Sequence, residues 1–436
     1  EDIKGAMEMG ISLFAGEAEG RLEGLFRDAY AGALKPLYNY LDELPGIESE
    51  PGPFLPSDLL GRSAGSFTSF DAGRGCPFKC SFCTIINVQG KKSRRRSARD
   101  VERIIRENVA QGITRFFITD DNFARNRDWE EIFDCLIKLQ DTEHISIRLT
   151  IQVDTMCHRI PGFIEKAGKA GVARVFIGLE NINPENLKAA GKSQNKIAEY
   201  RRMLLAWRSV GAITCAGYIL GFPSDTPESI IKDIKTIQQE LPVDLLEFFF
   251  LTPLPGSEDH RRLYEKGAWM NPDMNNYDLN HVTTMHPAMS KEEWEGVYRS
   301  AWDTYYTPGH IETVLRRARA SGMSIGKTLF LLLWFYVCIR YEGLHPLEGG
   351  YFRHKYRLDR RPGLPIESAL VFYPRRLWEI VSSHVRMLPL IWKCTRMRRR
   401  IKADPEALNY TDSALKDVSA GLEEYEASPE ALGQSN

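Results

Sequence analysis

Three cysteines in one short loop are the residues of this sequence best suited to chemistry. Cys76, Cys80 and Cys83 are spaced as CxxxCxxC within the segment GRGCPFKCSFCT. A cubane iron–sulfur cluster has four irons, so three thiolates from one loop leave one iron without a protein ligand. That iron is open to a substrate or a cofactor. The spacing therefore predicts a 4Fe–4S cluster with one reactive corner.

The spacing of these cysteines allows two other interpretations. A closed zinc site needs a fourth nitrogen or sulfur ligand, usually from a second ligand pair at similar spacing, and no such pair follows Cys83. A chance cluster of core cysteines is disfavoured because the loop is rich in glycine, proline and charge. The residue pattern favours the iron–sulfur cluster over both.

The elements around the loop alternate as strand and helix, which predicts an α/β fold with a parallel sheet. Six such units with right-handed crossovers predict a curved sheet or partial (β/α)6 barrel rather than a closed eightfold one. The strands are expected near 66–72, 114–119, 145–152, 174–179, 213–220 and 245–252. The helices include 98–111, 127–140, 193–210 and 226–240.

Polar or small residues stand at the carboxyl end of every predicted strand, where reactive groups collect in such folds. Singly, a strand-end aspartate often caps the next helix, and strand glycines often mark a bulge or close packing. Together they predict a polar pocket around the cysteine loop. After the loop they are Asp120, Asp121 and Asn122, then Gln152 and Asp154, Glu180 and Asn181, Gly217, Ile219 and Gly221, and TPLPGS at 252–257.

From about 61 to 257 the sequence resembles the radical S-adenosylmethionine (radical SAM) superfamily. The resemblance rests on the cysteine spacing, on Phe82 just before the third cysteine, and on GYILGFP with Glu228 further on. It implies a 4Fe–4S cluster on Cys76, Cys80 and Cys83 whose open iron binds S-adenosylmethionine. It also implies reductive cleavage to methionine and a 5′-deoxyadenosyl radical, with an external one-electron reductant of the flavodoxin or ferredoxin type.

The resemblance further implies roles for individual residues. The TDDN segment stands where many relatives hold the methionine amino group, which assigns that role to Asp120 or Asp121. Glu180 stands where a polar residue commonly meets the ribose or the methionine moiety. Gly217, Ile219 and Gly221 belong to the glycine motif that packs against adenine. For the three acidic residues, simple capping is the alternative.

The first sixty residues resemble the end of a cobalamin-binding domain and its linker. ISLFAGEAEG (11–20) and PGPFLPSDLL (51–60) carry this resemblance to a branch that includes radical methyltransferases and an anaerobic cyclase of chlorophyll precursors. No histidine precedes His144, so the DxHxxG signature that supplies a lower cobalt ligand is absent. Cobalamin is therefore expected of a parent protein rather than of this chain, which starts at Glu1 and is expected to be a processed or excerpted piece.

The carboxyl-terminal third is predicted to be mostly helical, with an extension over 258–322, an apolar and basic region over 323–402 and a disordered acidic tail over 403–436. The apolar run 329–339 is shorter than the ~20 residues that span a bilayer, which predicts a buried helix. From Arg340 to Lys402 basic residues are interleaved with Trp378, Leu388 and Trp392. This pattern predicts a segment on an anionic membrane, with nucleic-acid contact or a solvated basic face as alternatives.

The bulk properties set the remaining expectations. A chain of 436 residues suggests two or three structural units, and a net charge of −1 argues against wholesale nucleic-acid binding. Singly spaced cysteines outside the loop favour a reducing, cytoplasmic setting, and the apolar and basic region predicts peripheral contact at the inner membrane face. The predicted function is radical C-methylation of an unactivated carbon in a small, lipid-like substrate. Oxidative cyclisation, and a non-catalytic electron-transfer iron–sulfur protein, are the alternatives.

Overall fold

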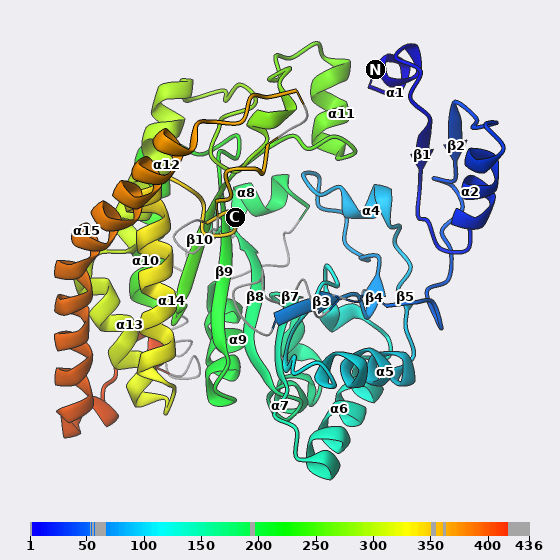
Figure 1. Cartoon of the computed structure of the whole chain (residues 1–436). Helices are drawn as coiled ribbons and strands as arrows, with labels where there is room; N and C mark the ends of the chain where they lie inside the picture. The colour runs from blue at the N-terminus through cyan, green and yellow to red at the C-terminus, as the bar shows by residue number, and fades with distance from the viewer. Residues whose placement is uncertain are drawn as a thin grey trace, which may run out of the picture. The chain divides into compact units, whose positions relative to one another are not determined.

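The computed structural model describes residues 2–52, 54, 56, 67–191, 197–349, 355–360 and 363–416 (Figure 1). The chain divides into two compact units. The first contains residues 1–178, 188–193 and 252–270, and the second contains 179–187, 194–251 and 271–436. Among the described residues, no helix combines the length and the apolar character needed to cross a membrane.

The first unit is built on parallel strands with helices between them. Its strands lie in the order β3 (Phe67–Phe70), β6 (Arg115–Ile118), β7 (Arg148–Asp154) and β8 (Val172–Glu180), and each neighbouring pair is parallel. The last two residues of β8 are counted with the second unit. The intervening helices are α5 (Ala98–Val109), α6 (Trp129–Glu143) and α7 (Phe163–Lys169). A capping box of Ser97 and Asp100 fixes the start of α5, and its apolar face is buried.

Shorter elements complete this unit. A parallel pair, β1 (Leu13–Ala15) and β2 (Leu37–Asn39), lies near the amino terminus with α1 (Asp2–Glu8) and α2 (Leu22–Tyr30). The cysteine region contributes β4 (Gly73–Arg74), α4 (Ile85–Val88) and β5 (Arg94–Arg95). The helix α11 (Glu258–Glu265) also belongs here.

The second unit contains β9 (Ile213–Leu220) and β10 (Leu245–Phe250), which are parallel. Every residue of β9 is buried, as expected for a parallel strand covered on both faces. The strand β10 packs against α12 (Lys291–Tyr305), with 5.0 Å between the rings of Phe248 and Trp302. The other helices are α8 (Pro184–Ala189), α9 (Ile197–Ser209), α10 (Pro227–Glu240), α13 (Pro308–Ala320), α14 (Ile325–Val337) and α15 (Ala369–Ala403).

The α/β fold with parallel strands is confirmed, and all six predicted strands are present within a few residues of their expected bounds. The apolar run 329–339 is the predicted buried helix: it lies in α14 and the π-helical turn Cys338–Glu342. The predicted domain boundaries stay a prediction.

The prediction of disorder for the whole tail from 403 onward is wrong for its first part. The short 3-10 helices Pro405–Leu408 and Ser413–Leu415 follow α15, and Asp412 forms an ion pair with the buried Arg317 at 2.8 Å. An acidic composition was compatible with order here because a buried guanidinium provides the counter-charge. Residues 417–436 lie outside the described residues.

Candidate functional site

The cysteine loop is closed at its base by a short antiparallel ladder. Gly73 pairs with Arg95, and Arg74 pairs with Arg94, so residues 75–93 form a loop between the two short strands. Inside it, the amide of Cys76 donates to the carbonyl of Gly90 at 3.2 Å. Gly75 has a φ of +93°, and a Cβ there would lie 2.4 Å from the carbonyl oxygen of Lys92. Only glycine fits at this entry to the loop.

The three motif cysteines are partly exposed, and none of the eight cysteines in the chain forms a disulfide. The amide of Cys83 donates to the carbonyl of Cys80 at 3.1 Å, so these two residues are held in one turn. Within the described ranges, no group of three His, Cys, Asp or Glu side chains is arranged to hold a single metal ion. Three accessible thiols from one loop are the donor set of a 4Fe–4S cluster with an open iron.

The carboxyl ends of β6 and β7 lie beside Cys76. Burial raises the pKa of the Cys76 thiol, the Phe78 amide and the Asn122 side chain lower it, and the charges of Asp121 and Asp154 raise it again. These electrostatic and hydrogen-bonding contacts place residues from two predicted strand ends next to the first cysteine. In this part of the predicted pocket, residues that are far apart in the sequence do lie close together.

Arg125 is a residue at this site that the sequence analysis missed. Its guanidinium donates to both carboxylate oxygens of Asp154, at 2.7 and 2.8 Å, and lies 5.4 Å from the centre of the Phe78 ring. Asn122 donates to the same carboxylate at 2.9 Å. The Asp154 carboxylate thus ties the end of β7 to the segment after β6. The only signal in the sequence was an arginine three residues after TDDN.

Asp120 and Asp121, the two candidates for holding the methionine amino group, have different surroundings. Asp120 is buried and accepts from the amides of Ala72 and Gly73, at 2.7 and 2.8 Å, and from Asn126 at 3.0 Å. Burial raises its pKa to about 7. One of its oxygens therefore holds the segment that leads into the cysteine loop, and the other is bound by the side chain of Asn126. Asp121 is half-buried, and burial raises the pKa of its carboxyl too.

The segment after the sixth predicted strand packs against the cysteine loop. Ser81 donates to the carboxylate of Asp259 at 3.0 Å, and the Asp259 amide donates to the carbonyl of Ser81 at 3.0 Å. Asn87 donates to the carbonyl of Gly256 at 2.7 Å. TPLPGS and the start of α11 thus support the loop that carries Cys80 and Cys83. Phe82, between them, is half-buried.

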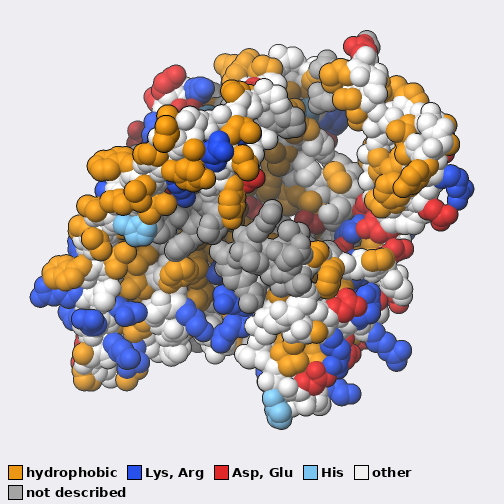
Figure 2. Space-filling model, in the orientation of Figure 1, with side chains coloured by type: hydrophobic (Ala, Val, Ile, Leu, Met, Phe, Trp, Pro, Cys, Tyr) orange, Lys and Arg blue, Asp and Glu red, His pale blue; other side chains and the backbone are white. Residues whose placement is uncertain are grey.

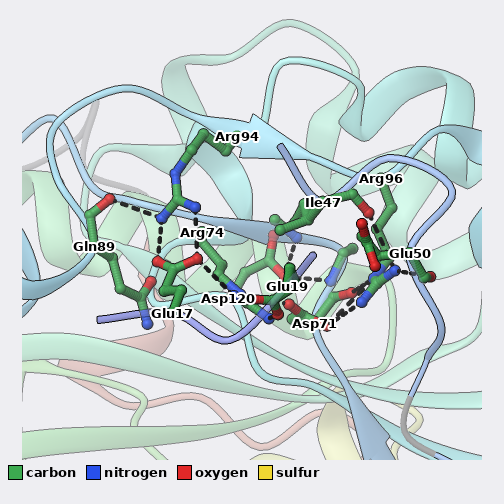
Figure 3. Close-up of polar contacts among 12 residues, drawn as sticks. Glu17, Glu19, Ile47, Glu50, Asp71, Arg74, Gln89, Arg94, Arg96 and Asp120 are labelled. Carbon is green, nitrogen blue, oxygen red and sulfur yellow. Dashed lines mark hydrogen bonds and ion pairs between the residues drawn. The ribbon is translucent and has the colours of Figure 1, made fainter. Parts of the chain in front are cut away.

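A cluster of arginines and carboxylates joins the amino-terminal segment to the base of the loop (Figure 3). Glu17 pairs with Arg74 at 2.7 Å and with Arg94 at 2.5 Å, and Glu19 pairs with Arg74 at 2.6 Å. Burial would raise the pKa of Glu17, but the two arginines outweigh it and hold that pKa below its usual range. The GEAE segment is therefore an ionic support for both short strands, a role its sequence did not reveal.

Arg96 extends this support into the interior. Its guanidinium is almost fully buried, pairs with Asp71 at 3.1 Å and donates to the carbonyls of Ile47 and Glu50 at 3.2 and 2.6 Å. A buried guanidinium is costly unless its donors are satisfied, and here carbonyls and a carboxylate satisfy them. The arginine run 94–96 thus fixes the loop from inside the unit.

The remaining predicted site residues belong to the second unit. Glu180 ends β8 with a φ of +65°, an uncommon conformation for a residue other than glycine. Gly217 and Ile219 lie in the buried strand β9. Gly221 has a φ of +104°, and a Cβ there would lie 1.9 Å from the indole of Trp294, so close packing alone requires a glycine. The cofactor-binding roles assigned to these four residues stay predictions.

Comparison with known proteins identifies the domain that carries this loop. Residues 72–237 match the family model described as the radical SAM superfamily. The chain carries a radical SAM domain. The matched residues include the cysteine loop, Asp120, Asp121, Glu180 and the glycine motif of β9.

Curated relatives of this radical SAM domain include methyltransferases. The bacteriochlorophyllide d C-12(1)-methyltransferase of Chlorobaculum tepidum is 27% identical over 279 residues, covering 62% of this chain and 59% of that protein. The hopanoid C-2 methylase of Rhodopseudomonas palustris is 26% identical over 207 residues, covering 47% and 39%. The chain spans about half the length of such relatives. A solved structure of the radical SAM methyltransferase TsrM from Kitasatospora setae is 18% identical, covers 56% of this chain and 52% of its own, and has a TM-score of 0.48.

Proposed function

We propose that this chain binds a 4Fe–4S cluster through Cys76, Cys80 and Cys83 and uses it to cleave S-adenosylmethionine. The observation that carries the proposal is the loop itself: three partly exposed, disulfide-free thiols on a loop closed by its own ladder. When bound and reduced, the cluster supplies one electron that breaks the sulfonium–C5′ bond, giving methionine and a 5′-deoxyadenosyl radical. The electron comes from an external reductant of the flavodoxin or ferredoxin type.

The chain's own residues have distinct proposed roles. Asp120 positions the entry to the loop, because both of its oxygens accept from the chain itself. Asp121 is the proposed partner of the methionine amino group, because it lies beside Cys76 and is only half-buried. Glu180 and the β9 glycine motif are proposed to meet the ribose or methionine moiety and the adenine, respectively. A radical of this reactivity also needs an enclosed pocket that excludes water.

Methyl transfer to an unactivated carbon is the proposed outcome, supported by the methyltransferase names of the curated relatives. The methyl group would come from a second molecule of S-adenosylmethionine, which leaves as S-adenosylhomocysteine, because the cleaved molecule keeps its methyl group on methionine. The external reductant would supply one electron for each of the two molecules. The substrate is proposed to be small and apolar, because those two relatives are named for a bacteriochlorophyllide and a hopanoid. A cytoplasmic location with peripheral membrane contact is proposed on the charge pattern of the carboxyl-terminal region.

The cleavage proposal is tested with protein reconstituted under anaerobic conditions. Wild type incubated with S-adenosylmethionine and dithionite is expected to form 5′-deoxyadenosine, measured by mass spectrometry. Cys80→Ala should lose both the cluster absorbance and the product. Cys135→Ala is the matched control, because Cys135 is also partly exposed but lies in α6, outside the loop. No 5′-deoxyadenosine from wild type with a full cluster would refute the proposal and leave the electron-transfer alternative.

The reaction outcome needs a separate measurement. S-adenosylmethionine carrying a deuterated methyl group, supplied to a cell extract with the reduced protein, should label an apolar product at a carbon. A product that has two hydrogens fewer than its substrate and carries no label would instead indicate oxidative cyclisation.

A further inference from the structure

The helix α15 presents a continuous apolar face away from the unit that it packs on. Phe372, Cys394, Met397 and Ile401 are its buried residues, and they define the inner face. The 3.6-residue period places a second row on the opposite face. Its members are Leu370, Pro374, Leu377, Trp378, Val381, Val385, Leu388 and Trp392.

This apolar row is open to solvent rather than covered. Leu370 is 87% exposed, Trp378 71% and Trp392 64%. Figure 2 shows hydrophobic side chains gathered along α15 and Lys and Arg side chains toward its carboxyl end. At 1.5 Å per residue, the row from Leu370 to Trp392 is about 33 Å long. An exposed apolar surface of this extent marks an interaction site.

The charges of α15 are almost all positive. The helix has nine Lys and Arg residues and one acidic residue, Glu379, which is half-buried and paired with Arg376 at 3.0 Å and Lys355 at 3.1 Å. Within the described part of the chain, six of the nine basic residues are in no ion pair. These are Arg386, Lys393, Arg396, Arg398, Arg399 and Lys402. Among the described residues, these six basic side chains on α15 therefore have no acidic partner to balance their charge.

The basic residues flank the apolar row and do not interrupt it before Trp392. By the helical period, Arg375, Arg386 and Lys393 form a line beside the row, and Arg396 and Arg399 continue the row itself past Trp392. The guanidinium of Arg396 lies 5.5 Å from the centre of the Trp392 ring. The apolar stripe thus passes directly into a basic end.

We propose that α15 is an interfacial helix that lies flat on an anionic lipid surface. A bilayer offers an apolar layer and a layer of negative headgroups next to each other, which fits an apolar row with basic residues beside it and at its end. Tryptophans at two positions along the row suit the headgroup boundary, where an apolar ring with one polar atom is stable. Arginine and lysine side chains extend from the flank to the phosphates.

Two other partners fit the same surface less well. A nucleic acid complements the charge, but it offers no continuous apolar layer for a row of eight exposed side chains. A second copy of α15 would cover the apolar row, but it would bring two sets of uncompensated basic residues together, which is unfavourable. Charge complementarity therefore favours anionic lipid as the single occupant.

The helix is held firmly enough for this role. It packs against α13 and α14, and Arg400 pairs with Glu312 of α13 at 2.6 Å. The inner face is thus used for folding, whereas the outer face is available for binding. The inference concerns binding alone and does not depend on the proposed catalytic function.

The test is co-flotation of the full-length chain with vesicles, without any catalytic readout. The chain should float with vesicles of phosphatidylcholine and phosphatidylglycerol at low salt, and much less with phosphatidylcholine alone. Each basic residue near an anionic surface strengthens binding about fivefold. Arg396→Gln with Arg399→Gln should therefore weaken partitioning by roughly 25-fold, and 0.5 M salt should weaken it further by screening. Lys232→Gln with Lys235→Gln, two exposed lysines of α10, should change nothing.

A second pair of variants tests the apolar row. Trp378→Ser with Trp392→Ser should abolish flotation, while circular dichroism and the midpoint of thermal unfolding stay unchanged because both side chains are exposed. Brominated lipid should quench the tryptophan fluorescence of wild type. Because this measurement needs no variant, it tests the proposal even if the double tryptophan variant fails to fold.

Two outcomes would overturn the inference. One is no flotation with anionic vesicles at low salt. The other is a stable dimer that light scattering detects in wild type, that the double tryptophan variant loses, and that does not bind vesicles. The first result removes the lipid partner, and the second assigns the face to a second copy of this chain.

Discussion

The ion pairs of Glu17 give the most direct test of how the amino-terminal segment supports the cysteine loop. Glu17→Ala removes the carboxylate that pairs with Arg74 and Arg94, and both guanidiniums lose a partner at the base of the loop. The three side chains are only 12–19% exposed. The cost therefore lies between that of an exposed pair and that of a buried one.

The size of the effect can be worked out from these two limits. Exposed ion pairs contribute about 0–1 kcal/mol, and removal of one partner from a buried pair costs about 3–5 kcal/mol. For a pair at this depth we expect a loss of about 2–3 kcal/mol in the free energy of unfolding. Glu43→Ala is the matched control, because Glu43 pairs with Arg21 but is 72% exposed. Its expected loss is below about 0.5 kcal/mol.

The pH dependence of the loss has a definite sign. The pKa of Glu17 is lowered in the folded protein, so its contribution is present above the unfolded pKa of about 4.3 and disappears as the pH falls through the folded value. Urea unfolding of the metal-free chain, measured by circular dichroism at pH 7 and at successively lower pH, tests both points. The difference between wild type and Glu17→Ala should shrink as the pH falls. Equal losses for Glu17→Ala and Glu43→Ala at pH 7 would refute the reasoning.

Three further predictions concern single residues of the two units. Gly221→Ala should lower the free energy of unfolding in urea by about 3 kcal/mol or more, because it combines a positive φ with a steric clash. Gly256→Ala is the control: its φ is +91°, but an added Cβ would have no atom within 4 Å, so the expected loss is about 1 kcal/mol. In wild type, the free energy of unfolding should fall between about pH 4 and 7, because the raised pKa of Asp120 means that its ionisation disfavours the folded state. Asp120→Asn should remove this fall, and an unchanged pH profile would contradict the prediction. Arg125→Lys should alter the electron paramagnetic resonance spectrum of the reconstituted cluster while thermal unfolding shifts little, because lysine cannot make both hydrogen bonds to Asp154.

The sequence was sufficient to predict the strands because hydrophobic periodicity is a local property. The predicted strand at 213–220 agrees with β9 residue for residue, since a fully buried parallel strand is a continuous apolar run with clear ends. The short ladder of β4 and β5 was not predictable in the same way. Two residues carry no periodicity, and their pairing depends on the loop between them.

The partners of individual side chains were harder to predict than the positions of the strands. TDDN was correctly placed at the end of a strand, but the sequence could not say which aspartate is turned inward. The structure separates them: Asp120 is 4% exposed and engaged by two backbone amides, while Asp121 is half-buried beside Cys76. A resemblance transfers a segment as a whole, whereas these two neighbouring residues, which follow β6, have different surroundings in the structure.

The arginine run before α5 shows why a charge run in a sequence is ambiguous. Three consecutive arginines would ordinarily be interpreted as a solvated basic patch. Here Arg94 pairs with Glu17, Arg95 pairs with Asp128 at 2.6 Å, and Arg96 is buried against Asp71. Their carboxylate partners lie up to 77 residues away in sequence, so no local pattern could reveal them. Because two of these contacts hold the short strands that close the cysteine loop, the geometry of the three thiols depends on residues well outside the motif that identifies them.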